Sequence, residues 1–219
     1  MDKLRLRFKK TGRSIYISHL DLMQTMQRAF SRAGFRLKYS EGFNPHPQIS
    51  IALPLSVGTA SLCEIMDFKL QGEADLKLLP RLLTEALPEG IEVLECYEAQ
   101  RKAAQLKYLR IEGLLEYDRQ EPAEMAERLR AFYAVPELII TKKTKRGFGD
   151  ADIRPAIKEI AFRPESDGVA VEAVISAQEP TLNPELLLEA LRQKAPELAP
   201  DFGKFTRIES YDSEMNIFR

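Results

Sequence analysis

The sequence predicts an α+β fold made of two similar units, each with an antiparallel sheet and helices on one face. Apolar residues make up 44% of the 219-residue chain, which is enough for a sizeable core. The predicted strands come in adjacent runs, which favours antiparallel pairing. The order of strands and helices over 1–100 recurs over 105–219, so we expect two units joined by a polar stretch around 100–102.

The first half begins with a strand in which Leu4, Leu6 and Phe8 alternate with basic residues. A helix is expected to start at Ser18, whose side chain can cap free backbone N–H groups, and to end at Gly34. The remaining expected elements are strands over 35–39, 48–53 and 62–70, a helix over 74–86, and a strand over 91–97.

The second half repeats this order with different residues. Its expected elements are strands over 107–117, 137–142, 152–162, 168–177 and 204–211, helices over 122–133 and 183–194, and a basic loop over 143–149. Strand, helix, two or three strands, helix and strand is the split β-α-β pattern of ferredoxin-like domains, with one extra strand allowed in each half. A single open α/β domain is the alternative.

Composition excludes several classes of protein. The charges nearly balance, with 32 basic and 33 acidic side chains, so the whole chain is not a polycation. Cys63 and Cys96 are too few for a disulfide framework or a cysteine zinc cluster. No apolar run approaches the length of a membrane span, and the N-terminus has no apolar signal core, so we expect a cytoplasmic protein with no membrane contact.

The balanced charge hides an asymmetry. Residues 1–50 carry ten basic and three acidic side chains, a net charge of +7, whereas the other 169 residues carry −8. A cationic end on an otherwise acidic chain favours a polyanionic partner. The alternative is that the fold scatters these cations over several faces.

Both histidines of the chain lie in this cationic segment. His19 is expected at the start of the first helix, beside free N–H groups that attract phosphate, and His46 lies in a loop. Either ring can serve as an acid or a base, while a hydrogen-bonded structural ring is the alternative for His19. Arg28 and Arg32 are four residues apart and share a helix face that suits phosphate, unless that face is only solvated.

The loop over 40–47 is the most informative stretch. Three residues restrict the backbone of this loop, so its side chains should point in fixed directions. We expect Phe43 to stack on a base, Asn44 to contact a base edge, and His46 to bind a phosphate or to act as an acid or a base. Alternatively, Phe43 fills the core and Asn44 forms an Asx turn. The residues that restrict the loop backbone are Gly42, Pro45 and Pro47.

The second half adds a basic loop that can extend an RNA surface, or that is merely a solvated hairpin tip. We also expect Asp152 and Arg154 to pair on one strand face. The candidate RNA-binding residues of the whole chain are Arg13, Ser18, Arg28, Arg32, Lys38, Tyr39, Ser40, Phe43, Asn44, Lys142, Lys143, Lys145, Arg146 and Arg154.

Common catalytic and cofactor motifs are missing. The sequence has no phosphate-binding Gly-rich loop ending in Lys-Ser or Lys-Thr, no Gly-x-Ser-x-Gly and no His-Glu-x-x-His. A metal site built from His19, Asp21 and His46 would need the helix start and the loop to converge, so we expect neither metal nor cofactor. The only catalytic candidates are His19 and His46.

Three motifs, Ser-His-Leu-Asp-Leu at 18–22, Tyr-Ser-Glu-Gly-Phe-Asn-Pro-His-Pro at 39–47 and Leu-Pro-Leu-Ser-Val-Gly at 53–58, resemble the radical-SAM-linked protein family. The resemblance is strongest over about 60 contiguous residues, and 152–155 and 206–211 are also similar. That family is a bacterial domain of unknown function, found alone, beside a radical SAM gene or fused behind a radical SAM enzyme. Its genes tend to lie near those of an RNA-processing ribonuclease and of ribosomal proteins.

The resemblance implies an RNA-related role with a radical SAM enzyme as partner, and it carries over no catalytic residues. The chain is not itself the radical enzyme. The [4Fe–4S] cluster of that class needs three closely spaced cysteines, and the sequence has only Cys63 and Cys96. Our leading hypothesis is an RNA-binding accessory protein, not catalytic on its own, that acts with a radical SAM enzyme in tRNA or rRNA modification or processing. The alternatives are an RNA-cleaving or RNA-modifying enzyme using His19 or His46, and a protein-interaction module that binds the radical SAM partner without RNA.

Overall fold

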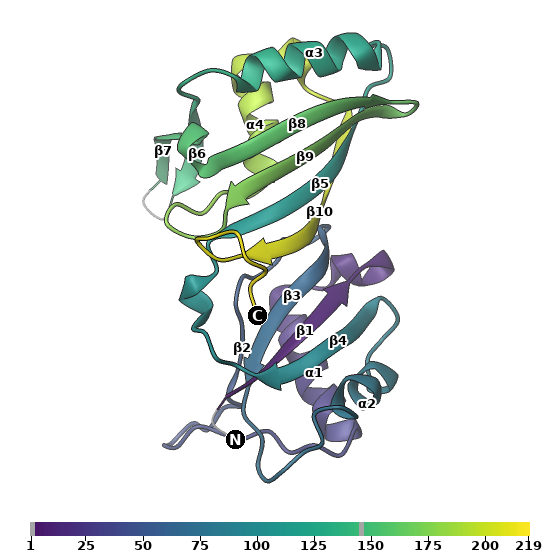
Figure 1. The fold of residues 1–219 in the computed structure, drawn as a ribbon, viewed down its shortest axis with the longest axis vertical. Coiled ribbons are helices and arrows are strands. Elements are labelled where there is room, and N and C mark those ends of the chain that lie inside the picture. The colour runs from purple at the N-terminus through teal and green to yellow at the C-terminus, as the bar shows by residue number, and fades with distance from the viewer. Residues whose placement is uncertain (1–2, 145–146) are drawn as a thin grey trace. The chain divides into compact units, whose positions relative to one another are not determined.

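The computed structural model describes residues 3–144 and 147–219. The chain divides into two compact units, one reaching to Gln105 and including Arg219, the other spanning Leu106–Phe218. Each unit combines an antiparallel sheet with two helices (Figure 1). The α+β class expected from the sequence is therefore confirmed.

The first unit contains a sheet in the order β4-β1-β3-β2. The first strand pairs antiparallel with β3 and β4, and β2 pairs antiparallel with β3. A short 3₁₀ turn, η1 (Gly12–Tyr16), separates β1 from α1. The elements are β1 (Leu4–Lys10), α1 (His19–Arg32), β2 (Ile49–Ile51), β3 (Ala60–Phe68), α2 (Leu79–Ala86) and β4 (Ile91–Glu98).

The core of this unit follows from the alternation in β1. Leu4, Leu6 and Phe8 are fully buried in one apolar cluster with residues of α1 and α2. Each such side chain stabilises the fold by about 1.5–3 kcal/mol relative to exposure. The helix α1 starts as expected, because the Ser18 hydroxyl accepts a hydrogen bond from the Asp21 amide at 3.2 Å.

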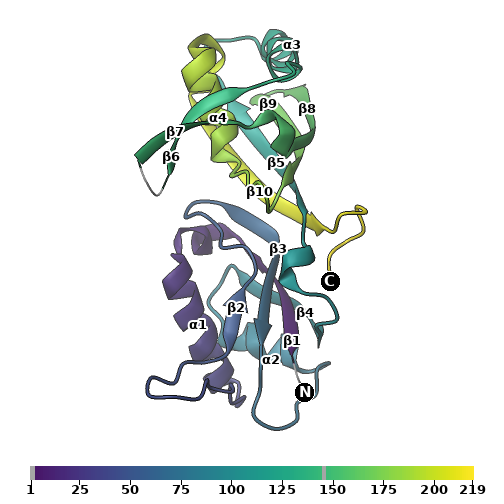
Figure 2. The ribbon, with the colours of Figure 1, turned by 90° about the vertical axis from the view of Figure 1, so that its left-hand side faces the viewer.

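The second unit contains a sheet in the order β10-β5-β9-β8 and a separate two-stranded hairpin, β6-β7, outside that sheet (Figure 2). Its core includes Tyr133, whose hydroxyl donates to the Leu187 carbonyl at 2.7 Å and whose ring stacks on Phe162. The elements are β5 (Tyr108–Glu116), α3 (Pro122–Tyr133), β6 (Ile139–Thr144), β7 (Gly147–Asp152), β8 (Ile157–Glu165), β9 (Gly168–Ser176), α4 (Glu185–Lys194) and β10 (Phe202–Tyr211).

Several expected elements differ in the structure. The strand expected over 152–162 is divided, because β7 ends at Asp152, a 3₁₀ turn covers Arg154–Ala156 and β8 starts at Ile157. The stretch 35–39 is not a strand, and only isolated bridges join Leu37 to Leu70 and Tyr39 to Pro47. The second helix begins at Leu79 rather than at 74, because Pro80 fits only the first turn of a helix. Most of the expected basic loop over 143–149 belongs to the strands β6 and β7.

Among the residues described, no helix is both long and apolar enough to cross a membrane.

Candidate nucleic-acid-binding site

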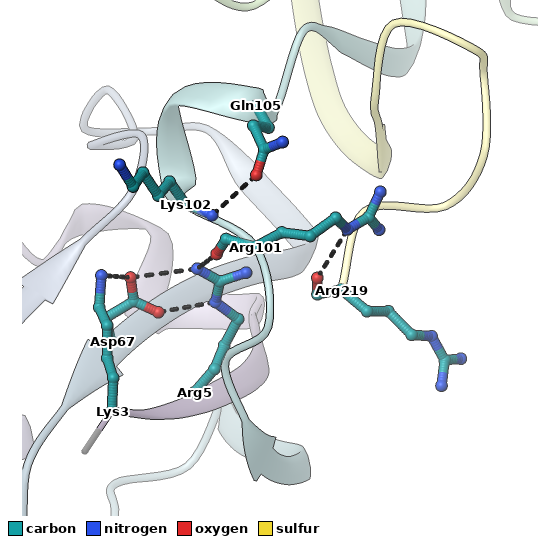
Figure 3. Close-up of polar contacts among 7 residues, drawn as sticks. All are labelled: Lys3, Arg5, Asp67, Arg101, Lys102, Gln105 and Arg219. Carbon is teal, nitrogen blue, oxygen red and sulfur yellow. Dashed lines mark hydrogen bonds and ion pairs between the residues drawn. The ribbon is translucent and has the colours of Figure 1, made fainter.

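Most cations of β1 are engaged within the first unit. The Arg5 guanidinium is fully buried and binds Asp67 through two atoms, with Nε 2.6 Å from Oδ1 and Nη2 3.1 Å from Oδ2. The same Nη2 donates to the Arg101 carbonyl at 2.9 Å, and Lys3 Nζ lies 2.7 Å from Asp67 Oδ2 (Figure 3). Arg5 and Asp67 are cross-strand neighbours, so the sheet register places a carboxylate opposite this buried cation.

The two lysines of β1 are also engaged. Lys9 Nζ lies 2.7 Å from Glu92 Oε2, and the buried Lys10 ammonium donates to the Ile15 carbonyl at 2.9 Å. Burial lowers the pKa of Lys10, and the nearby Glu64 carboxylate partly opposes that effect. The +7 charge of residues 1–50 therefore overstates what a polyanion can meet, because Lys3, Arg5, Lys9 and Lys10 already have protein partners.

The two histidines lie at opposite ends of the first unit. His19 is the first residue of α1, which follows β1 and the turn η1. The end of β1 pairs with the start of β3, so His19 lies toward that end of the sheet. His46 lines a small pocket with Lys3 and Phe68, at the start of β1 and the end of β3. A nine-residue strand such as β3 spans about 30 Å. The helix start and the loop therefore do not converge on one acid–base or metal site, and no group of three or more metal-binding side chains occurs among the described residues.

The residues around His19 serve the helix start. The Ser18 hydroxyl, a candidate RNA contact, lies 2.6 Å from Asp21 Oδ2 as part of the cap. His19 itself is half-buried, and its Nδ1 is enclosed without a hydrogen-bond partner among the described residues. Arg13 is exposed and lines a pocket of about 1070 Å³, which Glu89 and the Lys9–Glu92 ion pair also line.

The stretch 38–48, which we call the Phe43 loop, is closed at its neck. The Ser40 amide donates to the His46 carbonyl at 2.9 Å, and the His46 amide donates to Ser40 Oγ at 3.1 Å. The Ser40 hydroxyl also lies 2.9 Å from His46 Nδ1. Below the neck, the Gln48 side chain donates to the Tyr39 carbonyl at 3.2 Å. His46 therefore holds the loop shut in this structure.

The tip of the loop presents its side chains to solvent. Phe43 is fully exposed, so the alternative that it fills the core is wrong. Gly42 has a φ of 118°, a left-handed conformation that a side chain would strain. Asn44 is exposed and makes no side-chain hydrogen bond within the described residues, so the alternative Asx turn does not form. Tyr39 is 49% exposed at the base of the loop.

Cations that have no side-chain partner among the described residues lie beside the neck. Lys38 is exposed, and its amide donates to the Lys69 carbonyl at 2.8 Å, which brings Lys69 beside the loop. Lys69 lines the 240 Å³ pocket that contains His46, in which Lys3 is already paired with Asp67, and Arg36 lines another 240 Å³ pocket with Tyr39. Lys69 had no local signal in the sequence, because only the tertiary fold brings it to the loop.

The candidate arginines of α1 divide into two roles. Arg32 donates to the Ala86 carbonyl at the end of α2 at 2.5 and 3.2 Å, so its guanidinium caps that helix end. Arg28 is exposed and has no partner among the described residues, so it stays available to a phosphate.

The candidates of the second unit also divide. Lys143 is exposed and Lys142 half-buried on β6, whereas Lys145 and Arg146 lie outside the described residues. Arg154 is engaged, because its guanidinium donates to the Val135 and Ile157 carbonyls at 3.1 and 2.7 Å. The expected side-chain pair between Asp152 and Arg154 is wrong, since Asp152 Oδ1 instead accepts from the backbone amides of Leu138 and Arg154.

Comparison with known proteins places this chain in a bacterial family. The model of the family described as "Uncharacterized protein conserved in bacteria (DUF2344)" matches residues 3–184. The chain belongs to this family. The DUF2344 match includes the Phe43 loop and both strands of the β6-β7 hairpin, and it ends before α4.

Other comparisons are less informative. No curated protein matches the chain in sequence. A crystal structure of an unknown protein from Galdieria sulphuraria is 11% identical, with a TM-score of 0.27, and the match covers 94% of this chain and 97% of that one. The small subunit of acetolactate synthase from Thermotoga maritima is also 11% identical, with a TM-score of 0.27 and coverage of 97% and 98%.

Proposed function

We propose that this protein is a cytoplasmic RNA-binding accessory protein that acts with a radical SAM enzyme in tRNA or rRNA modification or processing. The observation that carries the proposal is Phe43, a fully exposed aromatic ring on a loop closed by Ser40 and His46. The ring contributes nothing to the core, and a braced loop that presents an aromatic side chain beside exposed cations is well placed to bind a partner.

An unpaired RNA base is the ligand that fits this environment best. Base–aromatic stacking contributes about 1–3 kcal/mol per base, and exposed cations beside the ring supply contacts to the adjoining phosphates. Lys38 lies within the loop, and Lys69 and Arg36 line pockets at its neck. A closed neck also means that little loop entropy is lost on binding.

The structure favours binding over catalysis in this proposal. A concerted acid–base pair of His19 and His46 is not available, since they lie at opposite ends of the unit. His46 is engaged with Ser40 in the neck of the loop. The alternative of an RNA-cleaving or RNA-modifying enzyme thus keeps only single-histidine chemistry. The choice of a radical SAM enzyme as partner is supported by the motif resemblance at 18–22, 39–47 and 53–58.

We also infer that each unit is a ferredoxin-like domain. The split β-α-β pattern has the strand order 4-1-3-2, and β4-β1-β3-β2 in the first unit has this order. In the second unit β10-β5-β9-β8 has the same order once the β6-β7 hairpin is set aside as an insertion.

The proposal is tested by binding of full-length protein to purified tRNA and to rRNA fragments over a range of salt concentrations. We expect affinity to fall steeply with salt, with a log–log slope of about −0.7 for each single-stranded phosphate neutralised. Because the chain contains no tryptophan, a Phe43→Trp variant has a single indole at the loop tip, and stacking should quench its emission. No binding to either RNA at low salt overturns the proposal. Co-purification with the radical SAM enzyme, or its absence, tests the partner separately.

A further inference from the structure

We propose that the β6-β7 hairpin of the second unit is an additional binding element for single-stranded RNA, with Phe148 as its stacking residue. This inference deepens the RNA-binding proposal, and it uses residues that the Phe43 loop does not include. Phe148 lies on β7 and is 80% exposed. Large aromatic side chains of an antiparallel sheet usually lie on the face that packs against the core.

Phe148 lies between two glycines and is largely open to solvent. Gly147 and Gly149 face the other side of β7, so that side carries no side chain at these two positions, and the ring itself is 80% exposed. Open space surrounds the position where a side chain on Gly147 would begin. A planar base can therefore approach the ring, whereas a protein hot spot is usually enclosed by several apolar groups.

The charges on the hairpin suit a nucleic-acid strand. Lys143 is the cross-strand partner of Phe148, so both side chains leave the same face of the hairpin, and Lys142 pairs with Gly149. On that face Asp150 is the next residue toward the base of the hairpin, and its carboxylate accepts from the Thr141 hydroxyl at 2.7 Å. Lys143 and Phe148 are thus cross-strand neighbours, and the Asp150 carboxylate on the same face already accepts a hydrogen bond.

The hairpin is fastened at its base, so the ring is held in a defined place. The Gln193 side chain of α4 exchanges two hydrogen bonds with the Thr141 backbone, at 2.8 and 2.9 Å. Ile140 is fully buried, and Asp152 accepts from the Leu138 amide at 2.8 Å. Such anchoring lowers the entropy lost when a ligand binds.

The local sequence also fits this chemistry. Arg146-Gly147-Phe148-Gly149 matches the first four positions of the RNA-binding strand motif Lys/Arg-Gly-Phe/Tyr-Gly/Ala, in which the aromatic residue stacks on a base. Here the glycines and the ring lie on an inserted hairpin rather than on the main sheet, so the likeness concerns the chemistry of the stacking residue.

The test uses full-length Phe148→Trp protein, whose single indole reports on the hairpin alone. We expect a 12-nucleotide oligouridine to quench its emission and a 12-base-pair RNA duplex to leave it unchanged. Phe202→Trp is the matched control, because Phe202 is 56% exposed in the same unit but pairs with Glu116. An unchanged Phe148→Trp emission, or an equal response of the control, overturns the inference.

Two further variants give the size of the effect. Phe148→Ala should weaken oligouridine binding about 5- to 150-fold, and Phe148→Tyr should retain binding. Lys143→Ala should reduce the salt slope by about 0.7. Phe43→Trp in the same titration separates the two proposals. If only the Phe43→Trp emission changes, this inference is overturned and the Phe43 proposal stands. If only the Phe148→Trp emission changes, this inference is supported and the Phe43 site is removed. If neither emission changes, both proposals are overturned.

Discussion

The strand β1 and the Phe43 loop both belong to the cationic segment 1–50 and to the same unit, yet they use their cations in opposite ways. In β1, the cross-strand carboxylates Asp67 and Glu92 meet Arg5 and Lys9. In the Phe43 loop, Lys38 remains exposed, and its ammonium group has no partner in the part of the chain that the structure describes. The difference shows that the charge of a segment measures potential for binding only after the partners within the fold have been subtracted.

The largest expected effect is on stability and comes from β1. Arg5→Ala leaves the Asp67 carboxylate in a buried site without its main partner, and should destabilise the protein by about 3–5 kcal/mol in urea unfolding. Lys9→Ala removes a partly exposed pair and should cost at most about 1 kcal/mol. If both variants unfold at the same urea concentration, Arg5 is not the structural cation that its contacts indicate.

The next effect concerns binding and comes from the loop. Phe43→Ala should weaken RNA binding by about 1–3 kcal/mol, because the stacked base loses its platform. The midpoint of urea unfolding should not move, since the ring makes no core contact. Retention of full affinity, measured by fluorescence anisotropy with labelled RNA, would remove the role assigned to Phe43.

A smaller effect is expected from the neck of the loop. Ser40→Ala removes the hydroxyl that accepts from the His46 amide and contacts His46 Nδ1. The loop then samples more conformations, and RNA affinity should fall by about 1 kcal/mol through the added ordering cost. Ser166→Ala is the control, because Ser166 is an exposed serine in the turn between β8 and β9 and lines no pocket of the loop. Equal affinities of the two variants would show that the closed neck does not assist binding.

The smallest effect separates the two sets of lysines. Lys38→Ala should reduce the dependence of log affinity on log salt by about 0.7, since one phosphate contact is lost. Lys9→Ala should leave this slope unchanged, because its ammonium group already pairs with Glu92. The comparison between β1 and the loop fails if Lys9→Ala changes the slope as much as Lys38→Ala does.

Local features of the sequence were predictable, and long-range ones were not. The Ser18 cap and the helix over Pro122–Tyr133 follow from signals within a few residues, and both occur as expected. The burial of Arg5 depends on Asp67, 62 residues away, and no local pattern indicates it. Whether Phe43 points into the core depends on the contact between Ser40 and His46, which closes the neck.

The second unit shows a signal that sequence analysis overlooked. The basic side chains of Lys142 and Lys143 led us to predict a loop. The structure has two strands there, and Phe148 is exposed on the second one. An aromatic residue between two glycines, next to basic residues, was visible in the sequence and could have identified the hairpin.

The polar cluster in Figure 3 has a practical consequence for isolating the first unit. The Arg101 carbonyl accepts from the buried Arg5, and the neighbouring Lys102 amide donates to the Gln105 side chain at 2.9 Å. A fragment that ends at Gln100 would leave the buried Arg5 guanidinium without the Arg101 carbonyl as an acceptor. A fragment that continues through Gln105 retains this hydrogen bond. For the same reason, trypsin should cleave native protein slowly at Arg101 and Lys102, although two basic residues in succession are an inviting substrate.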